Sequence, residues 1–264
     1  MIQASESRRA EENLFSPPFP SALAMILDAL PRLAASTKVV LASASPRRAE
    51  LLRQLGITKF EVRPSSFAED LPKTTDGASY ARATARAKAD EVAALVAKEE
   101  NEASEPRNVL VIAADTVVEV DSLILEKPSE TDGGLEGREM LRRLSGREHT
   151  VSTGVSLVLV RKAGFAAAGA AGAAREGTES AAALSTSSSR SFSETTVVRF
   201  ADLPDSEIDA YVASGENLGK AGGYGIQGSA GAFVERIEGC YFNVVGLPLH
   251  SLAREVAALM VDVE

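Results

Sequence analysis

The sequence predicts an α/β protein in which a buried sheet is flanked by helices. Residues 39–41 form a β-branched apolar run that leads directly into a helix-like segment at 46–55. Residues 77–99 are rich in alanine and lack proline, which favours one long helix. Residues 109–114 are apolar without interruption, which is the pattern of a strand covered on both faces.

The first strand–helix unit places two arginines in the first turn of its helix. Ser45 suits the N-cap, Pro46 the first helical position and Gly56 a left-handed helix end. Arg47 and Arg48 then lie at the end of the helix dipole that disfavours cations. A bound phosphate would offset this cost, since backbone N–H groups and two guanidinium groups would converge on it. Two solvated arginines in a surface turn are the simpler alternative.

The remaining elements are predicted in order along the chain. We expect strands near residues 60–63, 151–160, 197–200, 232–237 and 242–245, a hairpin over 117–125, and helices over 135–144, over 205–214 and from about 248. Residues 1–36 read as a loose leader with a helical turn or two near 22–30, and residues 37–264 as the folded domain. The Ala/Gly/Ser-rich tract 162–191 reads as an insertion at a hairpin tip.

Composition excludes several classes of protein. The net charge of −9 argues against a general nucleic-acid binder. A single cysteine, Cys240, excludes an intramolecular disulfide and a cysteine-based metal cluster, and His149 and His250 alone cannot build a multi-histidine zinc site. A metal here would be a hard cation such as Mg²⁺ or Mn²⁺ on oxygen ligands. No apolar run approaches the roughly 18 residues of a membrane span, so the cytosol is the expected compartment.

Two charged residues stand at positions where chemistry is expected. Asp115 follows the apolar run 109–114. Its role there is that of a metal ligand, of a base that orients water, or of a cap for the next turn. Lys88 falls on the core-facing side of the predicted long helix. The general expectation for such a lysine is that its amine extends to solvent, and contact with an anion is the alternative. With the two arginines, Lys88 and Lys127, Asp115 would supply the cations and the carboxylate that phosphoryl chemistry needs.

Other motifs are less specific. The glycine-rich loop 219–228 formally contains G-x-G-x-x-G, but a helix precedes it and a strand follows, the reverse of a dinucleotide fingerprint. The loop either places Lys220 and Gln227 near a ligand or is a plain turn. His149 reads as a structural histidine more readily than as a base, and Cys240 as a small buried apolar residue.

Six segments of the chain form a recognisable set of motifs. They are SASPRR at 43–48, ADT at 114–116, EKP at 126–128, MLRRLSGREH at 140–149, KAGGYGIQG at 220–228 and NVVGLP at 243–248. Together they closely resemble the Maf family of nucleoside triphosphate pyrophosphatases, also called septum-formation-inhibitor-like proteins. The resemblance covers about residues 38–260 in order, apart from the insertion, and details of it look more like the eukaryotic members.

The resemblance implies a fold, a reaction and a cofactor. The fold is a mixed α/β sheet with two lobes around a cleft, related to the inosine triphosphate pyrophosphatases, and several members are homodimers. The reaction is hydrolysis of a nucleoside triphosphate to the monophosphate and pyrophosphate with Mg²⁺ or Mn²⁺, in nucleotide-pool sanitation. Thr116 and Gln227, with Arg47, resemble the marks of the subgroup that acts on dTTP and UTP.

Further roles carry over by motif. Asp115 would accept the proton of the attacking water, and Glu69 with Asp115 would bind the metal. The residues that would hold the phosphates are Ser43, Arg47, Arg48, Lys88, Lys127 and Lys220. The chain departs from the family at Gly219, where members usually have Asp. The change would slow the enzyme if that Asp orients the lysine or metal, and would be harmless if it caps the turn.

Two other functions fit the same residues. A nucleotide-binding regulator of cell division would bind without physiological turnover, although it has no need to keep both Asp115 and the basic set. A pyrophosphatase for modified nucleotides would use the same chemistry in a broader pocket.

Overall fold

A computed structural model describes Leu30, Leu33 and residues 36–73, 76–105, 107–161 and 188–261. Within these residues seven strands form one mixed sheet, in the order β2-β1-β3-β5-β6-β7, with β4 paired to β3. The predicted α/β class is therefore confirmed. Nearly all of the predicted leader, including the turns expected near 22–30, lies outside the described residues, as do residues 162–187 of the predicted insertion.

The helices and strands follow the predicted order closely. The strands are β1 (Thr37–Leu41), β2 (Glu61–Val62), β3 (Asn108–Val120), β4 (Leu123–Leu125), β5 (Glu148–Val160), β6 (Ser188–Phe200) and β7 (Val234–Glu238). The helices are α2 (Pro46–Gln54), α3 (Gly77–Glu102), α4 (Leu135–Leu144), α5 (Asp205–Ala213), α6 (Tyr241–Val245) and α7 (Leu249–Val261), with short 3-10 turns η1 (Ala221–Gly223) and η2 (Ser229–Phe233). β1 is parallel to β2 and β3, and the other pairs are antiparallel.

Three predictions about these elements are corrected. β3 does not end before Asp115 but runs on to Val120, because β5 pairs with its residues 109–119. β6 begins at Ser188, so residues 188–191 of the predicted insertion belong to a strand that pairs with β5. The strand expected at 242–245 is helix α6, because the segment turns between two glycines at positive φ and places its asparagine against β5 and β6.

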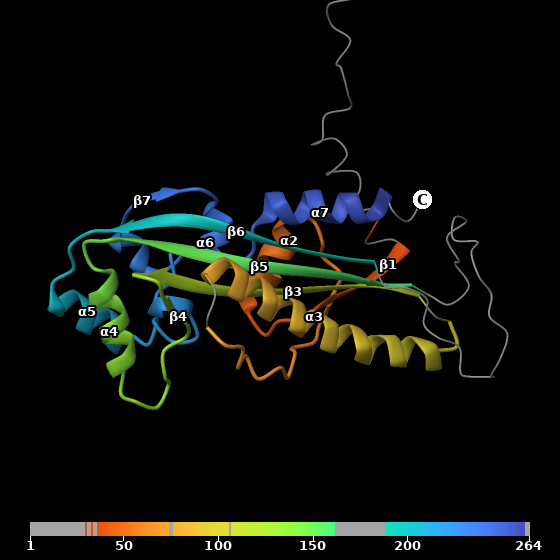
Figure 1. The fold of residues 1–264 in the computed structure, drawn as a ribbon, viewed down its shortest axis with the longest axis horizontal. Helices are drawn as coiled ribbons and strands as arrows, with labels where there is room; N and C mark the ends of the chain where they lie inside the picture. The colour runs from red at the N-terminus through yellow and green to blue at the C-terminus, as the bar shows by residue number, and fades with distance from the viewer. Residues whose placement is uncertain are drawn as a thin grey trace, which may run out of the picture.

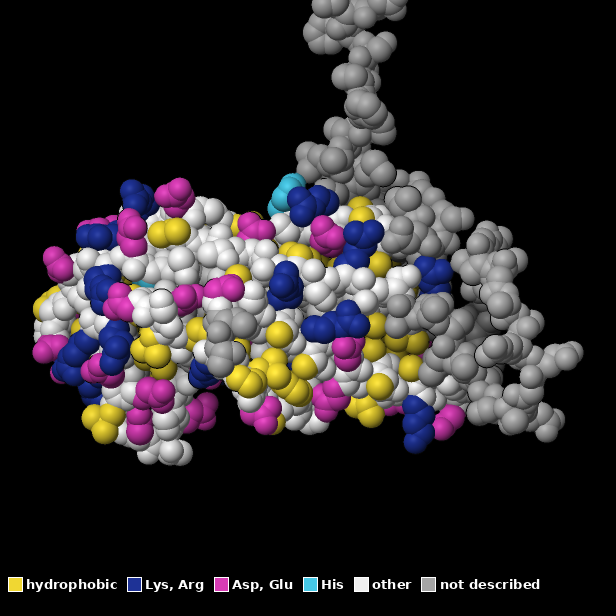
Figure 2. Space-filling view, viewed as in Figure 1, with side chains coloured by type: hydrophobic (Ala, Val, Ile, Leu, Met, Phe, Trp, Pro, Cys, Tyr) yellow, Lys and Arg dark blue, Asp and Glu magenta, His cyan; other side chains and the backbone are white. Residues whose placement is uncertain are grey.

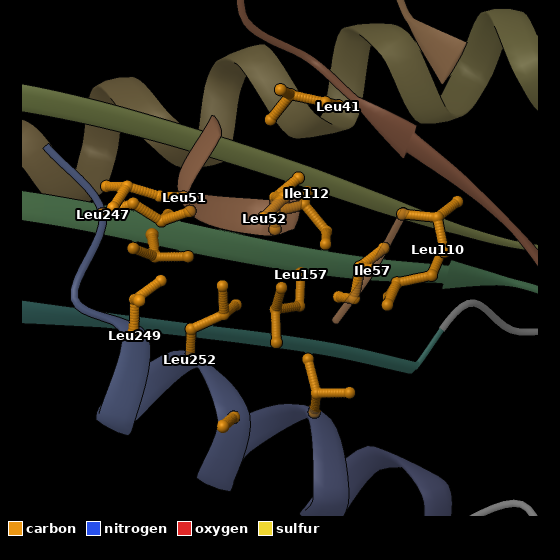
Figure 3. Packing of buried hydrophobic residues seen from close by; sticks show 14 of the residues in the cluster. Leu41, Leu51, Leu52, Ile57, Leu110, Ile112, Leu157, Leu247, Leu249 and Leu252 are labelled. Atoms are coloured by element: carbon orange, nitrogen blue, oxygen red, sulfur yellow. The ribbon is translucent and has the colours of Figure 1, made fainter. Parts of the chain in front are cut away.

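Helices cover both faces of the sheet (Figure 1). α3 packs on one face, with Val92 and Val96 against the apolar side chains of β1, β3 and β5. α2 and α7 cover the other face. Figure 3 shows Leu110, Ile112 and Leu157 of the sheet pointing toward Leu249 and Leu252 of α7. These two layers enclose the first half of β3.

The second half of β3 belongs to a different core. Here α4 and α5 pack with the ends of β3, β5 and β6, around the aromatic rings of Phe200, Tyr211 and Tyr224. α4 and α5 lie together at the end of the molecule away from α7 (Figure 1). The molecule therefore has two lobes that share the long central strands.

Between the two lobes, one edge of β3 has no neighbouring strand among the described residues. β1 pairs with residues 108–112 of β3 and β4 with residues 118–120, and β5 occupies the opposite edge. Residues 113–117 therefore have an open edge, and Asp115 lies at its centre. The open edge lets polar side chains of an otherwise buried strand meet a ligand.

Gly154 of β5 sets how closely α3 approaches the sheet. It is the cross-strand partner of Asp115. A Cβ at this position would lie 2.2 Å from the carbonyl carbon of Ala81 and 2.3 Å from the nitrogen of Arg82, both in the backbone of α3. Only glycine allows this contact between helix and strand.

Replacing Gly154 by alanine should lower the free energy of unfolding by about 2–3 kcal/mol, because the new methyl group must displace helix backbone. Urea denaturation measures the change. Gly228→Ala is the matched control, since its Cβ would meet only the carboxylate end of the Glu216 side chain, which can move. Equal destabilisation by the two variants would contradict the role given to Gly154.

Candidate active site

The open edge of β3 faces a cleft of about 560 Å³. This volume suits a small-molecule ligand. The walls come from the turn after β1, the loop before α3, the middle of β3, the loop after β4 and the glycine-rich loop. All of the predicted site residues line it, namely Ser43, Arg47, Arg48, Glu69, Lys88, Asp115, Thr116, Lys127, Lys220 and Gln227. The structure thus brings together in one place residues that are far apart in the sequence.

A lysine between two carboxylates lies in the wall of the cleft. Lys88 Nζ is 2.8 Å from Asp115 Oδ1 and 2.7 Å from Glu69 Oε1. Lys88 and Asp115 are only 7% and 6% exposed. The general expectation that the amine of Lys88 extends to solvent is therefore wrong, and the alternative of contact with an anion is right. Burying this amine requires a partner, and Asp115 and Glu69 provide it.

The two carboxylates have opposite pKa shifts. Burial raises the pKa of Asp115 above its ordinary value, although the charge and hydrogen bond of Lys88 oppose the shift. Burial also raises the pKa of Glu69, but the hydrogen bond and charge of Lys88 outweigh it, so its net pKa is lowered. Asp115 is thus the stronger proton acceptor of the two.

Arg48 is held by neutral oxygens. Its Nε donates to the carbonyl oxygen of Gly246 at 2.9 Å, its Nη1 to Ser43 Oγ at 3.0 Å and its Nη2 to Thr116 Oγ1 at 2.9 Å. Burial lowers the pKa of Arg48, yet a guanidinium stays protonated at neutral pH. Arg48 is therefore an ordered cation at the cleft and is not the solvated surface residue of the simpler alternative.

Arg47 reaches the glycine-rich loop. Its Nη2 donates to the carbonyl oxygen of Gly219 at 3.3 Å. Gly219 has a φ of +65°, and a Cβ there would meet nothing within 4 Å. This left-handed conformation is one that Asp also tolerates, which fits a turn-forming role for the position. Ser45 occupies the N-cap position of α2 as predicted, but its side chain makes no capping hydrogen bond.

The remaining predicted residues line the outer part of the cleft. Lys127 is exposed, and its Nζ lies 3.9 Å from Glu69 Oε1. Lys220 Nζ donates to the carbonyl oxygen of Glu216, and burial together with the charge of Arg47 lowers the pKa of Lys220. Gln227 is exposed in the same loop. The charged residues predicted for the site therefore lie together in the cleft. On the face of the molecule in view in Figure 2, acidic and basic side chains are instead interspersed.

Several supporting residues were not found from the sequence. Tyr80 Oη donates to Glu126 Oε1 at 2.8 Å, which ties α3 to the loop that carries Lys127. Behind the cleft wall, Thr153 Oγ1 donates a hydrogen bond to the carbonyl oxygen of Asn243. The signal for Thr153 is the register of β5 against β3, which places it opposite Thr116. Single-sequence patterns do not give this register.

His149 and Cys240 lie away from the cleft. His149 is buried, and its Nε2 is 2.8 Å from Tyr224 Oη, so the structural interpretation of this histidine is confirmed. Cys240 is only half-buried, at the N-cap position of α6, whereas a buried residue was predicted.

The carboxylates of the cleft fit a hard divalent cation that is shared with a substrate. No group of three or more His, Cys, Asp or Glu side chains that could hold a metal occurs among the described residues. Glu69 and Asp115 nevertheless flank Lys88 Nζ, and each has a second carboxylate oxygen besides the one that Lys88 binds. One or two carboxylates are what Mg²⁺ uses when phosphate oxygens and waters complete its shell.

Comparison with known proteins agrees with the motifs of the cleft. The model of the Maf-like protein family matches residues 38–259. The chain belongs to the Maf family. A relative from Salinibacter ruber, a dTTP/UTP pyrophosphatase, is 43% identical over 88% of this chain and 96% of its own length. A dTTP/UTP pyrophosphatase from Exiguobacterium sibiricum is 39% identical over 85% of this chain and 93% of its own.

A match to a human relative covers only about a third of that protein. The probable bifunctional dTTP/UTP pyrophosphatase/methyltransferase protein is 41% identical over 84% of this chain but only 32% of its own length. The family membership covers the whole described cleft, since its lining residues run from Ala42 to Gly246.

The buried His149 should make stability depend on pH. Burial lowers its pKa from 6.5 to about 4. Between these values the unfolded chain binds a proton that the folded chain does not, so stability falls as pH decreases from about 6.5 to about 4. Urea denaturation at several pH values should show the wild type losing up to about 1.4 kcal/mol per pH unit more than His149→Gln. Parallel losses in the two proteins would contradict this assignment.

Proposed function

We propose that this Maf-family chain hydrolyses dTTP and UTP to the monophosphate and pyrophosphate. The observation that carries the proposal is the gathering of a buried carboxylate and several cations in one nucleotide-sized cleft. The names of the relatives from Salinibacter and Exiguobacterium supply the substrates. A carboxylate with a raised pKa beside phosphate-binding cations suits hydrolysis of an acid anhydride.

Asp115 is the proposed proton acceptor for the water that attacks the α-phosphorus. Lys88 bonds to its Oδ1, which fixes the carboxylate, and Oδ2 is the oxygen that would take the proton. The raised pKa of Asp115 brings its basicity closer to neutral pH, where a general base works best. Attack at the α-phosphorus makes pyrophosphate the leaving group.

The cations of the cleft would bind the triphosphate and stabilise the leaving pyrophosphate. Arg48 is ordered by three neutral acceptors, so its charge is available to a phosphate. Arg47 reaches the same cleft from the first turn of α2, Lys127 from the loop after β4 and Lys220 from the glycine-rich loop. Cations placed before the reaction stabilise developing charge without reorganisation.

A divalent Mg²⁺ or Mn²⁺ is part of the proposal. Glu69 and Asp115 would hold it together with oxygens of the substrate. When bound, such an ion polarises phosphoryl oxygens and neutralises the charge of the leaving group.

Base selection is proposed to involve Thr116, Gln227 and Arg47. All three line the cleft, and Gln227 is the exposed amide of the glycine-rich loop, where it can bond to a base edge. No helix in the described part of the chain has the length and apolarity needed to cross a bilayer. The cytosolic location and the homodimer that the family resemblance suggests stay predictions.

The experiment is a substrate panel with the purified chain. Pyrophosphate and monophosphate release is measured for dTTP, UTP, CTP, dATP, GTP and 7-methyl-GTP with Mg²⁺ or Mn²⁺. We expect fast release from dTTP and UTP alone. Turnover of other bases would keep the chemistry and overturn the base selection. Tight binding without release from any nucleotide would favour a nucleotide-binding regulator instead.

Asp115→Asn should lower kcat for dTTP by about 10²–10⁴-fold with a small change in KM, because the amide cannot accept the proton. Steady-state kinetics with dTTP gives both constants. Asp70→Asn is the matched control, since Asp70 is exposed in the loop that carries Glu69 and is absent from the cleft lining. Full kcat in Asp115→Asn would remove Asp115 from the reaction.

A further inference from the structure

Behind Arg48 runs a line of hydroxyl groups that ends on a backbone carbonyl. Arg48 Nη2 donates to Thr116 Oγ1 at 2.9 Å, and Thr116 Oγ1 lies 2.9 Å from Thr153 Oγ1. Thr153 Oγ1 in turn donates to the carbonyl oxygen of Asn243 at 3.0 Å. Thr116 and Thr153 are direct cross-strand partners on β3 and β5, so their side chains share one face of the sheet.

The chemistry of these groups fixes the direction of every proton in the line. A carbonyl oxygen can only accept a hydrogen bond, so Thr153 must donate its single hydroxyl proton to the carbonyl oxygen of Asn243. Thr153 Oγ1 then has no proton left and can only accept from Thr116. Thr116 therefore donates its own hydroxyl proton to Thr153 Oγ1. One lone pair of Thr116 accepts from Arg48, so toward a nucleotide Thr116 can act only as an acceptor.

The far end of the line is firmly held. Thr153 and Asn243 both have 0% exposure. The side-chain amide of Asn243 donates to the carbonyl oxygen of Val151 at 2.9 Å and to Thr196 Oγ1 at 3.0 Å, which anchors α6 to β5 and β6. The carbonyl that receives the Thr153 proton therefore has a fixed position.

We propose that Thr153 is a positioning residue that acts on the substrate phosphates through Thr116 and Arg48. By taking the proton of Thr116, it makes Thr116 a fixed acceptor for Arg48 and so aims the guanidinium into the cleft. This inference rests on the proposed function in one respect, namely that the ligand of the cleft is a nucleoside triphosphate.

Arg48 depends on such an acceptor because its partners are neutral. Among the described residues, no carboxylate forms an ion pair with its guanidinium, whereas Lys88 has two carboxylate partners. Its orientation therefore rests on the hydrogen bonds to Gly246, Ser43 and Thr116. Of the five guanidinium N–H groups, those not used in these bonds can reach phosphate oxygens.

Removing the hydroxyl of Thr153 should reverse the role of Thr116. Its proton would lose its acceptor and could rotate toward Arg48, where a donor would face a donor. Losing a hydrogen bond to a charged group changes an equilibrium constant by about tenfold or more. We therefore expect Thr153→Val to raise the Kd for a triphosphate and lower kcat/KM for dTTP by about tenfold.

The test compares variants that keep or remove one hydroxyl group. Thr153→Ser keeps the hydroxyl and loses a buried methyl group, so it should be destabilised yet retain kcat/KM within about twofold of the wild type. Thr195→Val is the matched control: its hydroxyl also pairs with a cross-strand hydroxyl, Ser152 Oγ at 2.9 Å, but that pair does not lead to the cleft. It should leave the kinetics unchanged.

A double-mutant cycle tests whether the effect passes through Thr116. In the Thr116→Val background, Thr153→Val should cause no further loss, because the line is already broken. The readouts are kcat and KM for dTTP, the melting temperature, and the Kd of α,β-imido-dTTP by calorimetry. Should Thr153→Val fail to fold, Thr153→Ala replaces it, since it differs from Thr153→Ser by the hydroxyl alone.

Three results would overturn the proposal. The first is an activity that follows the melting temperature in both Thr153 variants, which is the behaviour of a purely structural residue. The second is additive losses in the double-mutant cycle, and the third is an unchanged Kd in Thr153→Val. A wild type that binds α,β-imido-dTTP but releases no pyrophosphate would contradict the proposed function alone, and the Kd comparison would still decide the role of Thr153.

Discussion

The buried contact between Lys88 and Asp115 is the interaction on which the cleft depends. A charged amine and a carboxylate that are both removed from water each need the other, and removing one partner of such a pair costs about 3–5 kcal/mol. Lys88 comes from α3 and Asp115 from the central strand, so the pair joins the helix layer to the sheet. Gly154 lets the two layers approach each other closely beside this pair.

The open edge of β3 explains why this contact belongs to a site. A strand neighbour along residues 113–117 would enclose Asp115 completely, but β1 ends before it and β4 begins after it. The two lobes have separate cores on either side of this break. On one edge of β3 the pairing with β5 continues past Asp115. The opposite edge of β3 is open there and gives the ligand access to a buried carboxylate.

The cations around the cleft are held in two different ways. Lys88 is paired with carboxylates, so its charge is largely used within the protein. Arg48 is held by hydroxyl and carbonyl oxygens, which order it and leave its charge uncompensated by a direct partner. This difference suits Lys88 to positioning the proposed base and Arg48 to binding phosphate.

Most helices and strands, and the proposed site residues of the cleft, were predicted from the sequence. The contacts between those residues were not. Helix α4 was predicted with its observed bounds, Leu135–Leu144. The end of β3 and the helix α6 were missed, since strand pairing and packing override local propensity there.

The site residues were found through motifs that lie far apart in the sequence, whereas the contacts between them depend on tertiary structure. The general expectation for Lys88 was wrong because its helix faces a carboxylate that the helix pattern alone does not show. Thr153 was missed because its role comes from register, since it lies opposite Thr116 across β3 and β5.

In the proposed reaction water attacks the α-phosphorus beside Asp115, and isotope labelling tests this step most directly. The chain is incubated with dTTP in H₂¹⁸O under single-turnover conditions, and both products are analysed by mass spectrometry. One ¹⁸O atom in dTMP and none in pyrophosphate is the predicted result. Label in the pyrophosphate, or release of orthophosphate, would place the attack on another phosphorus and contradict the account.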